Sequence, residues 1–101
     1  MKLIIKAVNL KLTPEIKKAV GEKIGTLDKF IPYVDPAVVE ASVEVALEAC
    51  HHKKGKIYYV EANVKVPGKV LRAEAREENI YKAINQVKDE LQRSFKKYKE
   101  I

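Results

Sequence analysis

Apolar and polar residues alternate along several short segments of the chain, and this period of two is typical of β-strands with one buried face. In residues 2–8 the positions of one face are all apolar: Leu3, Ile5 and Ala7. Residues 57–66 and 69–76 alternate in the same way, and the Pro-Gly pair at 67–68 between them predicts a turn. The pattern therefore predicts strands in these three places.

Residues 37–50 fit two periods at once. Glu40, Glu44 and Glu48 recur every four residues, as on one face of a helix, yet every odd position from Val39 to Ala49 is apolar. The high valine content favours the extended form, because β-branched side chains pack well on a pleated surface. We therefore predict a fourth strand here.

Two segments show helical periodicity instead. Thr13, Pro14 and Glu15 form a helix start, with a capping hydroxyl, a proline in the first turn and an acid near the positive helix end. The spacing of the apolar residues that follow predicts a helix over 14–30. Gly21 and Gly25 lie one turn apart inside this helix, which close approach of a second backbone and simple tolerance explain equally well.

The second helix is predicted over 77–99, where apolar residues form a continuous stripe along one face. These residues are Ile80, Ile84, Val87, Leu91, Phe95 and Tyr98. Glu77 and Glu78 favour its start and Lys96, Lys97 and Lys99 its end, although no N-cap residue is obvious.

The predicted order is β-α-β-β-β-α, an α+β fold. Each strand has one apolar face and each helix one apolar stripe, so both helices must pack on the same face of a four-stranded sheet. With 101 residues, the chain is long enough for one modest core, and we expect a single domain over residues 1–101.

The basic segment HHKKGK at 51–56 lies between two predicted strands and contains a glycine, which predicts the tip of a β-hairpin. A metal site would need further ligands, and the sequence has only the two histidines and one cysteine, Cys50. No helix follows the glycine to help bind a phosphate group. We expect neither a metal nor another cofactor, and only an electrostatic role for the tip.

The chain carries a net charge of +6. The outward face of the predicted sheet contributes nothing to this excess, because its five bases and five acids cancel. These ten residues are Lys2, Lys6, Glu40, Glu44, Glu48, Glu61, Lys65, Arg72, Glu74 and Arg76. An RNA-binding sheet would also need exposed aromatic side chains, and Tyr59 is the one candidate. The excess is therefore expected on the helices and loops.

There it is concentrated at the hairpin tip, along the first helix and at the end of the second. The helical bases are Lys17, Lys18, Lys23 and Lys29, then Arg93, Lys96, Lys97 and Lys99. They could merge into a basic ridge that follows a phosphate backbone, or they could simply solvate the two helices. Charge alone leaves both interpretations open.

Several classes of protein are poorly supported. The sequence has no Gly-rich phosphate loop, no nucleophile elbow and no carboxylate pair in a pocket-like context, so we expect neither an enzyme nor a small-molecule substrate. No apolar run approaches the roughly 20 residues of a membrane span. With a single cysteine, the pattern favours a cytoplasmic protein without a membrane partner.

Two long segments resemble a known family. They are LTPEIKKAVGEKIGTLDKF (12–30) and LRAEAREENIYKAINQVKDELQRSFKKYKE (71–100), and the resemblance to the ribosome hibernation-promoting factor / ribosome-associated inhibitor A family covers essentially the whole chain. Its most specific parts are the LTP helix start, LRAE running into IYKAI, and the L-x-R-x-x-K-K ending. Members have a β-α-β-β-β-α fold likened to double-stranded RNA-binding domains. They bind the small ribosomal subunit in the channel for messenger and transfer RNA, and so silence idle ribosomes.

The resemblance implies which residues bind RNA. The basic positions of the family fall on Lys23, Lys29, Arg93, Lys96 and Lys97. Thr26 and Glu90 stand where many members carry a base, and Asn79 stands where an aspartate is usual.

The chain, which stops at Ile101, resembles a short form that is a monomer off the ribosome, with ribosomal RNA of the small subunit as its partner. The competing interpretations are a general double-stranded RNA-binding module without preference for ribosomes and, as a third, a small α+β enzyme.

Overall fold

The computed structural model describes residues 1–30, 34–49 and 55–100 of the chain. The elements follow the predicted order β-α-β-β-β-α, with two short 3₁₀ helices added. They are β1 (Lys2–Val8), α1 (Pro14–Gly25), η1 (Thr26–Phe30), η2 (Pro36–Val38), β2 (Glu40–Ala49), β3 (Lys56–Val66), β4 (Lys69–Glu77) and α2 (Ile80–Glu100).

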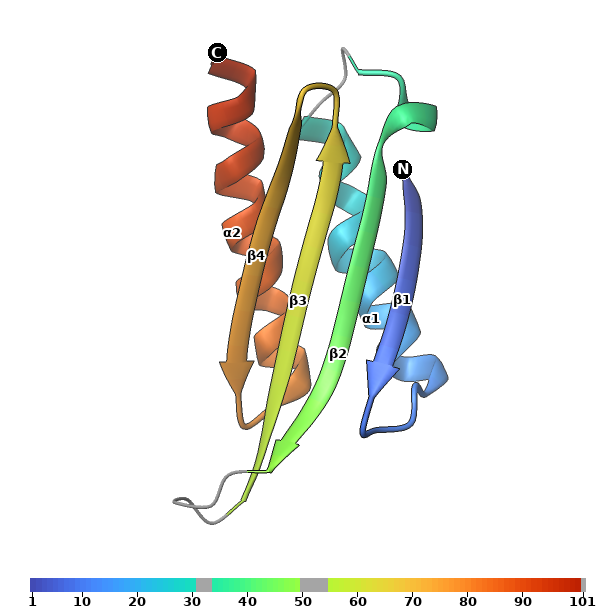
Figure 1. Ribbon diagram of the computed structural model, residues 1–101, viewed down its shortest axis with the longest axis vertical. Helices are drawn as coiled ribbons and strands as arrows, with labels where there is room; N and C mark the ends of the chain where they lie inside the picture. The colour runs from blue at the N-terminus through green and yellow to red at the C-terminus, as the bar shows by residue number, and fades with distance from the viewer. Residues whose placement is uncertain (31–33, 50–54, 101) are drawn as a thin grey trace.

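The four strands form one sheet in the order β1-β2-β3-β4 (Figure 1). β1 runs parallel to β2, and the other neighbours are antiparallel. The register aligns Val43 of β2 with Ala62 of β3, and Ala62 with Ala73 of β4, all of which are buried. The predicted alternation is therefore confirmed: one face of the sheet is apolar and packed, and the other carries the charged residues.

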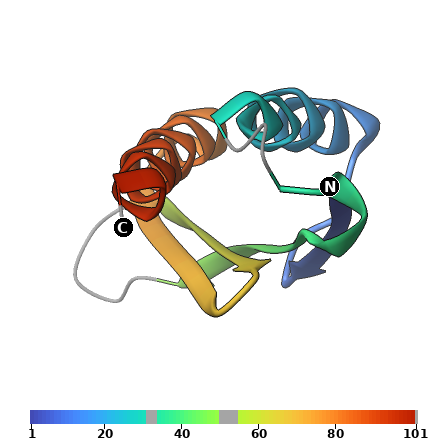
Figure 2. The same ribbon diagram turned by 90° about the horizontal axis from the view of Figure 1, so that it is seen from above.

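Both helices cover the apolar face, side by side (Figure 2), as the single stripe on each helix predicts. The core lies between them and the sheet, and its largest fully buried side chains include Ile24, Leu27, Leu91 and Phe95. These four side chains come from the end of the first helical segment and from the second half of α2, and they belong to one core. No helix in the described part of the chain is long and apolar enough to cross a membrane.

The first helix differs from the prediction at its end. The α-helix stops at Gly25, and residues 26–30 continue as the 3₁₀ helix η1. The Thr26 hydroxyl donates a hydrogen bond to the Lys23 carbonyl at 3.0 Å, which satisfies one of the last carbonyls of α1. A Cβ atom added at Gly21 or Gly25 would meet nothing within 4 Å, so no second backbone approaches them and tolerance is the better explanation.

The second helix begins three residues later than predicted. β4 extends through Glu77, and Asn79 caps the helix: its side-chain oxygen accepts hydrogen bonds from the amides of Tyr81 at 2.8 Å and Lys82 at 3.2 Å. Asparagine is among the best N-cap residues, so the capping signal was present in the sequence and was missed.

The strand predicted over 37–50 is also shorter than expected. Residues 36–38 form η2 instead, and β2 begins at Glu40. β2 and β3 are antiparallel neighbours, as a hairpin requires, and their pairing extends to Ala49 and Lys56. His51 and His52, on which the question of a metal at the tip depends, lie outside the described residues.

Candidate nucleic-acid interface

The exposed face of the sheet is electrically balanced. The ten charged residues predicted for this face lie on it, and several form ion pairs across the strands. The Arg72 guanidinium lies 3.3 Å from carboxylate oxygens of both Glu61 and Glu74, and Arg76 lies 3.2 Å from Glu48. Both arginines are therefore neutralised locally, and this face has little attraction for a polyanion.

Tyr59 is on this face but is not an exposed aromatic, contrary to the expectation from sequence. Only 9% of its surface is accessible, because the Arg76 guanidinium lies 4.4 Å from the ring centroid and covers it. Its hydroxyl lies 2.5 Å from a Glu61 oxygen and 2.7 Å from a Glu74 oxygen. A single proton can be donated to only one carboxylate at a time, so Arg72, which contacts both, completes the network.

This network shifts two pKa values in opposite directions. Burial raises the pKa of Tyr59 above its ordinary range, and the hydrogen bonds to Glu61 and Glu74 raise it further. The hydrogen bond from Tyr59, with a second from Asn63, lowers the pKa of Glu61. The cluster is thus a closed structural network, with no free aromatic surface for stacking against a base.

The helix side is different. Lys23 lies in the last turn of α1, Lys29 in η1, and Arg93, Lys96 and Lys97 in α2; we call these five residues the helix-side cations. All five are exposed. None of them lies within 4.0 Å of a carboxylate in the part of the chain that the structure describes. Their positive charge is therefore available to an external anion.

Two helix-side cations from different elements meet at one aromatic ring. The Lys29 ammonium lies 5.5 Å from the centroid of the Phe30 ring, and the Lys96 ammonium lies 5.9 Å from the same centroid. Both distances are within the usual reach of a cation–π interaction. Phe30 itself is partly buried and packs against the core, so the ring is held where η1 meets α2.

The other three helix-side cations are arranged along their own helices. Arg93 lies one turn before Lys97 on α2, at the spacing that places two side chains on the same face. Lys23 is exposed in the last turn of α1. The structure thus places Lys29 and Lys96 against one ring, whereas Lys23, Arg93 and Lys97 are separate exposed charges on α1 and α2.

Two positions weaken the positive field of this surface. Glu90 lies one turn before Arg93 on α2 and is half-buried. The Thr26 hydroxyl contributes a helix-capping hydrogen bond rather than a positive charge.

Phe30 is the functional candidate that sequence reasoning missed. Its only signal was an aromatic residue directly after a lysine at the end of a helical segment.

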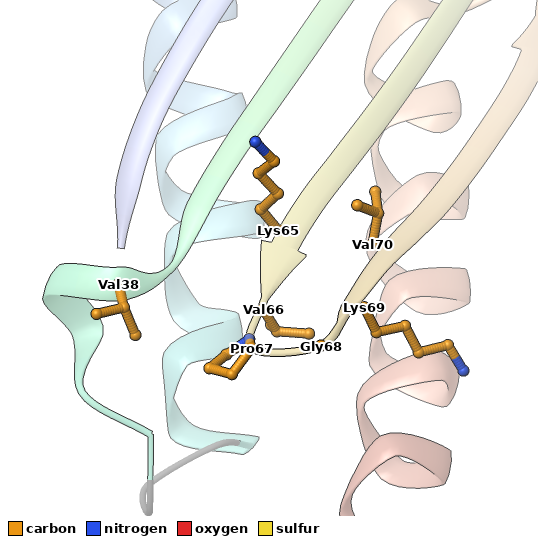
Figure 3. A pocket seen from close by; sticks show the side chains of 7 residues that line it. All are labelled: Val38, Lys65, Val66, Pro67, Gly68, Lys69 and Val70. Carbon is orange, nitrogen blue, oxygen red and sulfur yellow. The ribbon is translucent and has the colours of Figure 1, made fainter.

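The described residues also show a hollow of about 540 Å³, at the turn between β3 and β4 (Figure 3). η2 contributes Val38, and the remaining lining residues belong to the turn and its flanks, including Lys65, Pro67 and Val70. Val38 and Val70 are each more than half exposed, so the hollow is a shallow depression open to solvent. Its charged lining residues are Lys65 and Lys69, and the others are apolar side chains and a glycine.

Comparison with solved structures identifies the fold. The N-terminal domain of Protein Y from Thermus thermophilus superimposes with a TM-score of 0.77 over 97% of this chain and 99% of that one, at 23% identity. A ribosomal subunit interface protein from Coxiella burnetii gives a TM-score of 0.73 over the full length of both chains, at 18% identity. The α+β fold predicted from sequence is therefore confirmed.

Sequence comparison gives the family. The ribosome hibernation promotion factor of Bacillus subtilis is 32% identical over 95 residues, which are 94% of this chain and 47% of that protein. The chain thus spans about half the length of this relative. The ribosome hibernation promoting factor of Acinetobacter guillouiae is 28% identical over 101 residues, covering all of this chain and 89% of that protein. Residues 3–101 match the family described as Sigma 54 modulation protein / S30EA ribosomal protein, and the chain belongs to this family.

Proposed function

We propose that this protein is a non-enzymatic ribosome hibernation factor that binds ribosomal RNA of the small subunit through the helix-side cations. The observation that carries the proposal is the difference in net charge between the two sides. The five bases and five acids of the sheet face cancel, and both of its arginines are paired, whereas the helix-side cations have no carboxylate partner among the described residues. Unpaired charge on one side favours a polyanion such as RNA.

The arrangement suits a phosphate backbone better than bases. Lysine and arginine side chains on adjacent elements offer several donors along one surface, which phosphate oxygens can accept without regard to sequence. Tyr59 on the other side is buried under Arg76, so it offers no stacking platform. Five neutralised phosphates predict that the logarithm of the binding constant falls with the logarithm of salt with a slope of about −4 to −5.

The names of the relatives supply the biological setting. Proteins named ribosome hibernation promotion factor and ribosomal subunit interface protein share its family or its fold. In this proposal residues 1–101 act as one ribosome-binding domain in the cytoplasm, monomeric off the ribosome. The domain occupies the channel for messenger and transfer RNA, so translation stops because its substrates are excluded.

The proposal is tested by sedimentation of the purified protein with isolated small subunits. We expect the protein to move with the small subunits, and to remain with them in the presence of a tenfold excess of random double-stranded RNA. Complete transfer to the competitor RNA would instead identify a general double-stranded RNA-binding module. A footprint on small-subunit RNA outside the channel would contradict the proposed mode of inhibition.

A further inference from the structure

Phe30 is placed where it can organise the surface rather than only fill the core. Its ring has the ammonium groups of both Lys29 and Lys96 within 6 Å, one from its own 3₁₀ helix and one from α2. The two lysines are far apart in sequence, and the ring is the described feature that they share.

Two ammonium groups placed against one ring need a reason. Lysine side chains are long and flexible, and two like charges repel, so they would otherwise separate into solvent. The negative face of an aromatic ring attracts both, and it can hold each of them at the ring without neutralising it. Each ammonium group therefore keeps its donors for an external acceptor.

We propose that Phe30 is a positioning residue whose ring holds Lys29 and Lys96 as a preorganised pair for the phosphate backbone of RNA. This inference rests on the proposed function and adds a residue without charge to the binding surface. Preorganisation raises affinity because the side chains lose less freedom when the ligand binds. The ring is not itself a base-stacking platform, since it packs against the core and faces the two ammonium groups.

The comparison with Tyr59 supports this assignment. Arg76 also lies over an aromatic ring, but it donates to Glu48 at 3.2 Å, so its charge is already satisfied. Neither Lys29 nor Lys96 has a carboxylate within 4.0 Å in the described residues. A cation near an aromatic ring is thus paired with an acid on the sheet face and has no acid partner among the described residues on the helix side.

The test is a mutant cycle that separates the effect of the aromatic face on binding from the effect of apolar packing. Phe30→Leu keeps an apolar side chain but removes the aromatic face, and Phe30→Trp restores an aromatic face. Binding to small subunits should weaken about three- to tenfold in Phe30→Leu and stay within about twofold of the wild type in Phe30→Trp. In a Lys29→Gln/Lys96→Gln background, Phe30→Leu should change binding less than about twofold, because the ring no longer has cations to hold.

Arg76→Gln is the matched control, since it removes the ring–cation contact of the sheet face and should leave binding unchanged. Equal losses from Phe30→Leu in both backgrounds, or equal losses from the Leu and Trp variants, would overturn the inference. Melting temperatures of all variants identify any loss caused by unfolding.

A second measurement needs no ribosome. In the free protein, NMR signals of the Lys29 and Lys96 side chains should show ring-current shifts that disappear in Phe30→Leu. Absence of these shifts in the wild type would overturn the inference even if ribosomes bind. Their presence in a protein that does not bind small subunits would instead contradict the proposed function.

Discussion

The two sides of this small domain carry similar groups and use them differently. On the exposed face of the sheet, five acids and five bases cancel, and Arg72 and Arg76 are each bound to carboxylates. On the helix side, the five helix-side cations are exposed, and none has a carboxylate partner among the described residues. The comparison shows that net charge, and not the number of charged groups, distinguishes the two sides, because the charges of the sheet face cancel and the excess of +6 lies elsewhere.

The two aromatic–cation clusters make the same point in detail. Tyr59 lies under Arg76 and donates toward two glutamates, so the whole cluster is satisfied internally. Phe30 has no polar group in its side chain, and two ammonium groups lie within 6 Å of its ring centroid. A tyrosine with nearby acids stabilises the fold, whereas a phenylalanine with nearby lysines leaves charge available for a partner.

The largest expected effect comes from removing charge on one side only. Changing Lys23, Arg93 and Lys97 to glutamine should weaken binding to small subunits by roughly 100-fold or more near 0.1 M salt, since each phosphate contact contributes close to one unit of salt slope. The three side chains are exposed, so the fold should survive. The measurement is sedimentation or fluorescence titration over a series of salt concentrations.

The matched control is the triple change of Lys2, Lys6 and Lys65 to glutamine. These lysines are also exposed, and their replacement removes the same formal charge, this time from the sheet face. Binding should fall far less than in the helix-side variant. Equal losses would mean that net charge alone governs binding, and the assigned surface would be wrong.

On the sheet face, the expected loss is in stability. Tyr59→Phe removes the hydroxyl that Glu61 and Glu74 share, so the free energy of unfolding should fall by about 1–2 kcal/mol. Binding to small subunits should not change. Urea denaturation measures the first quantity, and a loss of ribosome binding in a folded variant would show that the two sides are coupled.

The same network predicts how stability depends on pH. Tyr59 has a raised pKa in the folded protein, so its contribution is present below its ordinary value of 10.0 and is lost as the pH rises above it. Glu61 has a lowered pKa, so its contribution is present above its ordinary value of 4.5 and is lost as the pH falls through the folded pKa.

Urea denaturation over a pH series should therefore show a decline at both ends. Tyr59→Phe should flatten the alkaline decline, and tyrosinate absorbance should show a late ionisation in the wild type that this variant lacks. A variant with the same alkaline decline as the wild type would exclude Tyr59 as its source.

The smallest expected change is a gain in affinity for small subunits. Glu90 lies one turn from Arg93 and repels phosphate, so Glu90→Gln should tighten binding about threefold at low salt. The advantage should shrink as salt screens the charge. Glu40→Gln, which removes an exposed acid from the sheet face, should leave the affinity unchanged in the same titration.

The strands and the core were predictable because they depend on local periodicity. Every inward position that the alternation selected in β3 and β4 is buried or half-buried, from Tyr58 to Ala75. The apolar stripe of α2 fits the core in the same way, with Phe95 fully buried. These features repeat along the chain, so neighbouring residues are sufficient to identify them.

The remaining features depend on contacts between distant residues. Phe30 and Lys96 meet because η1 packs against α2, and neither segment shows this by itself. Tyr59 is buried because Arg76, on the next strand, covers its ring. The positions of the five helix-side cations were expected from the family resemblance, and their role in RNA binding stays a prediction.

The parallel pairing of β1 with β2 has a consequence for folding kinetics. β2, β3, β4 and α2 contact neighbours that are close in sequence, whereas β1 reaches its partner only across α1 and η1, with Lys2 opposite Glu40. Long-range pairing is slow because the entropy of loop closure is lost before its contacts form.

We therefore expect the β2–β4 meander and α2 to form the folding nucleus, with β1 joining late. In stopped-flow kinetics, Val60→Ala in β3 should mainly slow folding, and Ile5→Ala in β1 should mainly speed unfolding. The reverse pattern would place the parallel strand in the nucleus. β1, the edge strand that docks last, would then also be the part of the sheet that opens first in native-state hydrogen exchange.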